Sequence, residues 1–139
     1  MKINRFKAFV FFLVFLSLFL LSVHDVMGIF DAHKLLQDRV VVSGAINDAS
    51  TFVFAWAMFV VSVFMVVCLI TGKKLLWIPK IFVIIPGGIS ILVFLAGWKA
   101  NERLEVKLLE KNYIECTSER ELALKSSSRT YVLDPSLCD

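Results

Sequence analysis

Residues 51–72 read TFVFAWAMFVVSVFMVVCLITG, a continuous apolar run without a charged side chain. A helix of this length rises about 33 Å at ~1.5 Å per residue, which matches a bilayer hydrocarbon core of about 30 Å. The run also lacks the alternation of polar and apolar residues that membrane β-strands show. It therefore predicts a membrane-spanning helix.

Two further runs, residues 6–23 and 81–98, have the same character, and the only charge in them is Lys7 at the outer edge of the first. The 139-residue chain is 58% hydrophobic, against about 45–50% in soluble domains. We therefore expect an all-α membrane protein: a three-helix membrane domain over residues 1–98 and a soluble tail over residues 99–139.

The charges that flank the runs predict the orientation. The N-terminus and the loop 73–80 each carry three basic residues and no acid, whereas the loop 24–50 carries four Asp against two basic residues. Cytoplasmic segments retain Lys and Arg. The N-terminus and loop 73–80 are thus expected in the cytoplasm, and loop 24–50 and the tail outside, which in a bacterium is the periplasmic side of the inner membrane. The basic residues are too sparse for nucleic-acid binding.

The first run also resembles a signal peptide, because basic residues precede it and Val26-Met27-Gly28 follows it. Cleavage would then fall after Gly28 and leave two spans. The apolar stretch is longer than the usual ~7–15 residues, and Asp25 lies within the expected cleavage region. An uncleaved anchor is the preferred interpretation, and cleavage stays open.

The loop 24–50 contains apolar residues near helical spacing, which predicts a short interfacial helix over about residues 31–41. The residues that carry this pattern are Phe30, His33, Leu36 and Val40. Gly44 interrupts the pattern, and residues 48–51 offer capping side chains for the second span.

The third run contains Pro86-Gly87-Gly88 close to its middle. Proline removes a helical hydrogen bond and glycines remove side chains, so a kink or a close helix crossing is expected here. The crossing could serve packing against the second helix or contact with a membrane partner. The interiors of the three runs carry no ionisable side chain except Cys68, which argues against a proton or ion pathway.

The tail begins with residues 99–111, where Ala100, Leu104 and Leu108 continue a helical stripe beyond the membrane. From Asn112 onward, short apolar stretches predict strands of a β-hairpin separated by a polar turn at residues 126–128.

The tail also carries Cys116 and Cys138, which the predicted topology places in an oxidising compartment. Such a short segment buries little core, and a disulfide that closes a loop of about 20 residues would stabilise it by about 3 kcal/mol. We therefore prefer a disulfide between these two residues over free thiols.

The sequence offers no set of residues for catalysis, metal binding or cofactor binding. Two histidines, His24 and His33, and two tail cysteines fall short of a zinc ligand set. No Ser/His/Asp arrangement or phosphate-binding glycine loop is present. We expect a protein that is not an enzyme and carries no cofactor or metal.

The tail pattern Asn112-Tyr113-x-Glu115-Cys116, followed by SSRTYVLD over residues 127–134 and by Cys138, is similar to a group of uncharacterised small inner-membrane proteins of enteric Gram-negative bacteria. This resemblance implies a location in the Gram-negative inner membrane, three spans and an external tail with a disulfide. It implies no catalytic or binding residue.

Small three-span proteins without intramembrane charge resemble immunity proteins against pore-forming bacteriocins and secreted effectors. The leading hypothesis is therefore an immunity protein that binds a membrane-acting or periplasmic antibacterial toxin. The alternative is a small accessory subunit or assembly factor of an envelope complex. Besides the lipid bilayer, a protein partner is expected, and the chain is compatible with a homo-oligomer.

Overall fold

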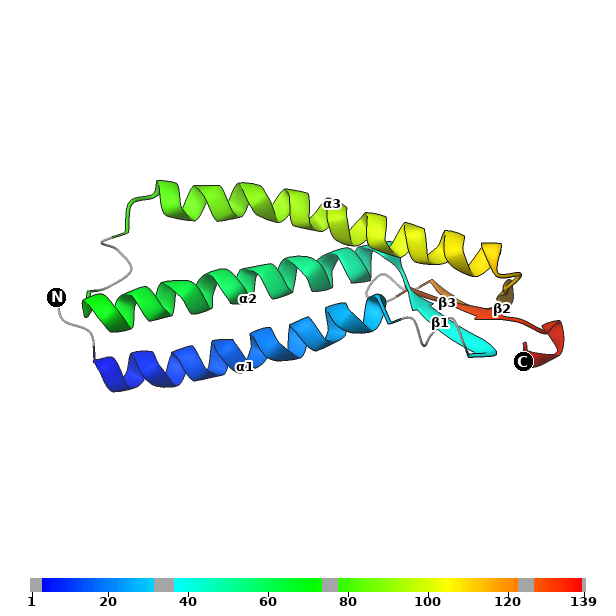
Figure 1. The fold of residues 1–139 in the computed structure, drawn as a ribbon, viewed down its shortest axis with the longest axis horizontal. Helices are drawn as coiled ribbons and strands as arrows, with labels where there is room; N and C mark the ends of the chain where they lie inside the picture. The colour runs from blue at the N-terminus through cyan, green and yellow to red at the C-terminus, as the bar shows by residue number, and fades with distance from the viewer. Residues whose placement is uncertain (1–3, 32–36, 74–77, 123–126, 139) are drawn as a thin grey trace.

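The computed structural model describes residues 4–31, 37–73, 78–122 and 127–138. Within these residues, three long helices lie side by side, with the second in the middle (Figure 1). They are α1 (Arg5–Ile29), α2 (Ala45–Thr71) and α3 (Ile81–Glu110). A small sheet and a 3-10 turn lie at one end of the bundle, opposite the N-terminus (Figure 1). They consist of β1 (Arg39–Ser43), β2 (Ile114–Leu122), β3 (Ser127–Val132) and η3 (Pro135–Leu137).

Each of the three helices is long and apolar enough to cross a membrane, so the chain has the composition of a multi-pass membrane protein. The predicted runs lie within them, except that Gly72 is the C-cap of α2. The helices extend beyond the predicted runs: α1 continues to Ile29 and α2 begins at Ala45. The expected caps at residues 48–51 are therefore wrong, because Gly44 is the N-cap and Asp48 lies in the first turn.

The sheet is antiparallel with the strand order β1-β3-β2. The hairpin of β2 and β3 confirms the strands expected in the tail, but Ser127 and Ser128 belong to β3 rather than to a turn, and residue 126 lies outside the described residues. β1 comes from the segment before α2 and pairs with β3, so that Val40 is opposite Tyr131. The soluble region is thus built from two parts of the sequence.

The interfacial helix expected over residues 31–41 is wrong at its C-terminal end, since Arg39–Ser43 is a strand; residues 32–36 lie outside the described part of the chain. The cause is the run of three valines, whose β-branched side chains favour a strand once β3 offers a partner. Val40 and Val42 are buried while their neighbours are exposed, as a strand with one covered face requires.

The spanning helices pack through small residues. Those buried in α2 recur every six or seven positions: Ala49, Ala55, Ser62 and Cys68. Helix α3 lies close to α2 at Gly97, where an added Cβ would lie 2.8 Å from the Cα of Ala49. Interfaces of this kind are typical of helices in lipid, where close backbone approach replaces the hydrophobic effect.

The Pro86-Gly87-Gly88 segment lies inside α3. The Trp56 indole of α2 donates a hydrogen bond of 3.1 Å to the Pro86 carbonyl. An added Cβ at Gly87 or Gly88 would meet no atom of the described residues within 4 Å, so these glycines are not needed for a helix contact within one chain.

The part of α3 beyond the predicted span forms the support of the sheet. Leu104 and Leu108 are buried in one cluster with side chains of β1, of β3 and of the residue that precedes β2. The other members of the cluster are Val40, Val42, Tyr113 and Tyr131. We call the sheet, η3 and residues 99–113 the juxtamembrane module.

A turn at Asn112 sends the chain from α3 back onto the sheet. Asn112 has a φ of 64°, in the left-handed region that asparagine tolerates better than most residues. The Tyr113 amide then donates to the Leu108 carbonyl at 3.1 Å and the Asn112 amide to the Leu109 carbonyl at 3.1 Å. This Schellman motif ends the helix and inserts Tyr113 next to Leu108 in the core.

Candidate binding surface on the outer face of the sheet

The two faces of the sheet have different surroundings. Val40 and Val42 point toward α3, so Arg39 and Val41 point toward the opposite side, which we call the outer face. Val41 is register-paired with Thr130, which is in turn paired with Cys116. Thr130 and Cys116 are buried, whereas Val41 remains 54% exposed. The β1 side of the outer face is therefore open.

A bulge in β2 enlarges this face. Cys116 pairs with Thr130 and Glu121 pairs with Ser128, so residues 117–120 of β2 are opposite the single residue Arg129 of β3. The extra residues bend the strand away from its partner. They border a hollow of about 410 Å³ whose lining is polar. Its lining residues include Arg39, Ser118, Glu119, Arg120, Glu121 and Thr130.

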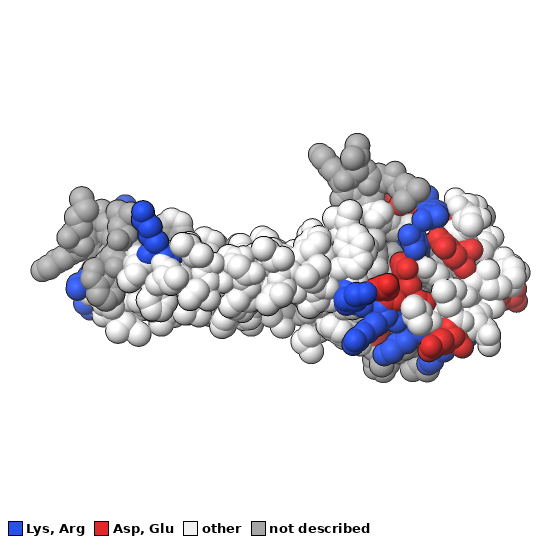
Figure 2. Space-filling model, turned by 90° about the horizontal axis from the view of Figure 1, so that it is seen from above, with Lys and Arg blue, Asp and Glu red and all other residues white. Residues whose placement is uncertain are grey.

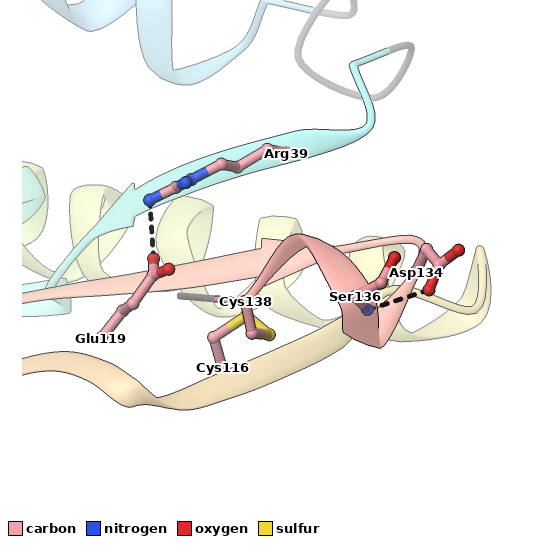
Figure 3. Close-up of a disulfide and its surroundings, with 6 residues drawn as sticks. All are labelled: Arg39, Cys116, Glu119, Asp134, Ser136 and Cys138. Atoms are coloured by element: carbon pink, nitrogen blue, oxygen red, sulfur yellow. Dashed lines mark hydrogen bonds and ion pairs between the residues drawn. A yellow bond between two sulfur atoms is a disulfide. The ribbon is translucent and has the colours of Figure 1, made fainter.

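An ion pair connects the bulge to β1 across the outer face. The Arg39 guanidinium donates to Oε2 of Glu119 at 2.8 Å, and the two side chains point toward each other in Figure 3. The Glu119 side chain is only 15% exposed, whereas that of Arg39 is 47% exposed. The guanidinium is therefore held in place with part of its surface open to a partner.

The disulfide fixes the C-terminal segment beside this hollow. Cys116 of β2 and Cys138 are bonded, with Cα atoms 5.7 Å apart and a separation of 22 positions in the sequence, which confirms the expected pair (Figure 3). The bond ties η3 to the sheet. Asp134 caps this turn by accepting a hydrogen bond of 2.9 Å from the Ser136 amide. Hydrogen bonds from the Ser136 amide and hydroxyl lower the pKa of Asp134 below its ordinary value.

A buried polar contact fixes the orientation of the module on the helices. Asn101 of α3 is 1% exposed and donates from Nδ2 to the Asp48 carboxylate at 2.7 Å and to the Ser43 carbonyl at 2.7 Å. These bonds join α2, α3 and the end of β1. Asp48 lies in the first turn of α2, where the helix dipole favours a negative charge.

Ion pairs on the inner face add to this support. Arg129 of β3 donates to both carboxylate oxygens of Glu105 of α3 at 3.2 Å. Oε1 of Glu115 is buried without a hydrogen bond from the described residues, but two guanidinium groups lie 3.7 and 3.9 Å from it, those of Arg120 and Arg129. Burial raises the pKa of the neighbouring Tyr131 phenol above its ordinary value.

The predicted residues fall into two separate places. Cys116 and Cys138 lie at the outer face, whereas Pro86, Gly87 and Gly88 lie in the spanning part of α3. Pro86 is 18 residues before Leu104, about 27 Å along the helix axis. No local sequence pattern predicted the contact between Arg39 and Glu119, because the two residues are 80 positions apart. The three valines that follow Arg39 could have predicted a strand, which would have placed Arg39 in the sheet.

The outer face offers a guanidinium, carboxylates and hydroxyl groups beside an exposed valine. In the part of the chain that the structure describes, no group of three His, Cys, Asp or Glu side chains could hold a metal ion. Such a surface is suited to recognising another protein through hydrogen bonds, one charge pair and a small apolar contact.

Residues 40–139 match the family described as "Protein of unknown function (DUF1240)", and the chain belongs to this family. The match begins at the second residue of β1 and includes the rest of that strand, α2, α3, β2, β3 and both bonded cysteines, whereas Arg39 lies outside it. Apart from Arg39, the juxtamembrane module thus lies within the region that matches the family. No curated protein and no solved structure matches the chain.

Proposed function

We propose that this member of the DUF1240 family is a non-enzymatic binding protein of the bacterial inner membrane, whose juxtamembrane module faces the periplasm. It acts as an immunity protein: the outer face binds a membrane-acting or periplasmic antibacterial toxin before the toxin damages the cell. The observation that carries the proposal is the open outer face, with the Arg39 guanidinium held by Glu119, at one end of the helical bundle.

The orientation rests on two features at opposite ends of the bundle. Arg5, Lys7, Lys73 and Lys80 lie at the end where the N-terminus and the α2–α3 connection are found (Figure 1). Lys and Arg favour the cytoplasmic side. The disulfide lies at the other end, and disulfides form in oxidising compartments such as the periplasm. Both features support a cytoplasmic N-terminus and a periplasmic C-terminus.

Rigidity supports binding by the module. The core around Leu108, the Asn101 contact and the disulfide fix the position of the sheet. Few side chains of the outer face therefore have to be ordered when a partner binds. Preorganised surfaces lose less conformational entropy when a partner binds. The polar hollow also gives a toxin surface specific hydrogen-bonding partners rather than a purely apolar contact.

The decisive experiment is co-expression of the chain with the toxin encoded by a neighbouring gene, in cells that the toxin kills. We expect the chain to restore survival. A Val41→Asp variant should lose protection, because it places a charge at the centre of the contact. The matched control is Val106→Asp, since Val106 of α3 is 49% exposed but is not on the outer face.

Unchanged killing in the presence of the wild-type chain would show that the immunity function is wrong. Equal protection by the Val41→Asp and Val106→Asp variants would show that the outer face is not the contact. Stable co-purification with a larger envelope complex, without a toxin gene nearby, would favour the accessory subunit instead.

A further inference from the structure

A groove of about 470 Å³ lies where α1 ends, beside the first turns of α3 that follow the spanning segment. Its floor is apolar and combines residues of all three helices with the residue after α1. The floor consists of Ile29, Phe30, Phe52, Ala96, Ala100 and Leu104. The rings of Phe30 and Phe52 contact each other edge to face, with centroids 5.8 Å apart, and form one wall.

The rim of the groove is basic. Lys99, Arg103 and Lys107 follow each other at four-residue intervals and therefore share one side of α3. Among the described residues that line the groove, Asp31 is the one acid, so their net charge is 3 − 1 = +2. Glu102 pairs with Lys99 at 2.6 Å but does not line the groove. Figure 2 shows Lys and Arg side chains, with Asp and Glu side chains beside them, where the white spanning part meets the module.

The groove lies at the level where lipid headgroups are expected. The apolar segment of α3 ends at Trp98, and tryptophan prefers the membrane–water interface. Side chains on a helix tilt toward its N-terminus, which for α3 is the membrane side. The ammonium and guanidinium groups of Lys99, Arg103 and Lys107 are therefore carried back toward the headgroups, and the apolar floor continues toward the hydrocarbon core.

We propose that this groove binds one molecule of an anionic phospholipid from the leaflet that faces the module. The lipid phosphate contacts Lys99, Arg103 and Lys107, and part of an acyl chain lies along Phe30, Phe52 and Ala96. An inorganic anion would use the basic rim only and leave the apolar floor uncovered. A zwitterionic lipid would bring a second cation to a rim that is already positive. The site is separate from the outer face and does not depend on the immunity function.

The test uses the purified full chain in a neutral detergent, with thermal unfolding followed at increasing concentrations of three probes: phosphatidylglycerol, phosphatidylcholine and inorganic phosphate. We expect phosphatidylglycerol alone to raise the unfolding temperature in a saturable manner. Native mass spectrometry of the same samples should show one bound phosphatidylglycerol per chain.

Lys107→Gln and Lys111→Gln form the matched pair of variants. Both remove one lysine charge from the same end of α3, but Lys111 does not line the groove. A basic residue near a lipid surface contributes about 1 kcal/mol, so Lys107→Gln should weaken apparent affinity about fivefold, and Lys111→Gln less than about twofold. Arg103→Gln provides a second test of the rim, with an expected loss of similar size.

Ala100→Phe tests the apolar floor without a change in charge. The larger ring fills the groove, so phosphatidylglycerol should stabilise this variant less than the wild type. Equal stabilisation by inorganic phosphate would mean that the groove takes a free anion, and equal loss in Lys107→Gln and Lys111→Gln would mean a diffuse charge effect. Either result, or a full phosphatidylglycerol effect in Ala100→Phe, would overturn the proposed lipid site.

Discussion

The spanning helices and the juxtamembrane module bury opposite kinds of side chain. In the helices, the buried positions are small residues such as Ala55, Ser62 and Gly97, and the Phe, Leu and Ile side chains largely face outward. In the module, large residues such as Leu108 and Tyr131 are buried and charged residues surround them. Helix α3 belongs to both regions.

The difference is the one expected for apolar helices that are long enough to cross a membrane and a module that lies in water. Lipid is as apolar as leucine, so the burial of large apolar side chains between helices is not favoured over their exposure to lipid. Close backbone contact holds the helices together instead. Water drives large apolar side chains inward. A substitution should therefore act according to the region in which it lies, even within the single helix α3.

Leu108→Ala should have the largest effect. Leu108 is 0% exposed at the centre of the module core, and removal of a buried leucine typically costs about 2–5 kcal/mol. The neighbouring residue Leu109 is 58% exposed, so Leu109→Ala should cost less than about 0.5 kcal/mol. Amide hydrogen exchange of β3 in the full chain measures the free energy of opening. Similar values for the two variants would contradict the proposed core.

Cys116→Ser should lower the stability of the module by about 3 kcal/mol, because the unfolded segment is no longer closed at Cys138. Loss of protease resistance in residues 99–139 and altered mobility on a non-reducing gel report the change. Cys68→Ser is the control, since Cys68 is a free thiol buried in α2. If Cys116→Ser leaves both readouts as they are in the wild type, the bond does not stabilise the module.

Gly97→Ala tests the spanning region by overpacking. The new Cβ would lie 2.8 Å from the Ala49 backbone and 3.0 Å from the Phe52 ring, so α2 and α3 must separate, at about 1–3 kcal/mol. Gly88→Ala meets no described atom within 4 Å and should be neutral or gain up to about 1 kcal/mol of helix propensity. Thermal unfolding in detergent distinguishes the two. Equal destabilisation would refute the assignment of the crossing to Gly97.

The sequence predicted the spanning region better than the module. The helices depend on local sequence, whereas the module depends on contacts between residues that are far apart in the chain. Whether residues 51–71 form a helix is decided by local composition and length. The pairing of Val40 with Tyr131 joins residues 91 positions apart, and local periodicity cannot reveal it. The disulfide was predictable because cysteines are rare enough in this chain for the tail pair to stand out.

At Pro86-Gly87-Gly88, where a kink or a helix crossing was expected, the Pro86 carbonyl accepts a hydrogen bond from Trp56 of α2, but no described atom lies opposite the two glycines. Pro86-Gly87-Gly88 is conspicuous in sequence, but a contact depends on what lies opposite, and that is Ala49 and Phe52 opposite Gly97. The small residues of α2 recur over six or seven positions, a spacing that a search at four-residue intervals overlooks. The open outer face was hidden because it depends on the bulge in β2, which forms only against β3.

Asp134 should give the smallest effect, confined to the module and visible only in acid. Its pKa is lowered in the folded protein by the hydrogen bonds from Ser136, so the folded state favours the ionised carboxylate. The contribution of Asp134 to the stability of the module is therefore present above the ordinary pKa of 3.8 and is lost as the pH falls through the lower pKa of the folded state.

Asp134→Asn keeps a capping side chain but removes the titratable group. The slope of module stability against pH below about 4 should be shallower in this variant, while the helicity of the spanning region stays the same. An identical slope in both proteins would show that Asp134 is not linked to folding, and a matching acid response in the spanning helices would mean that the two regions do not unfold separately.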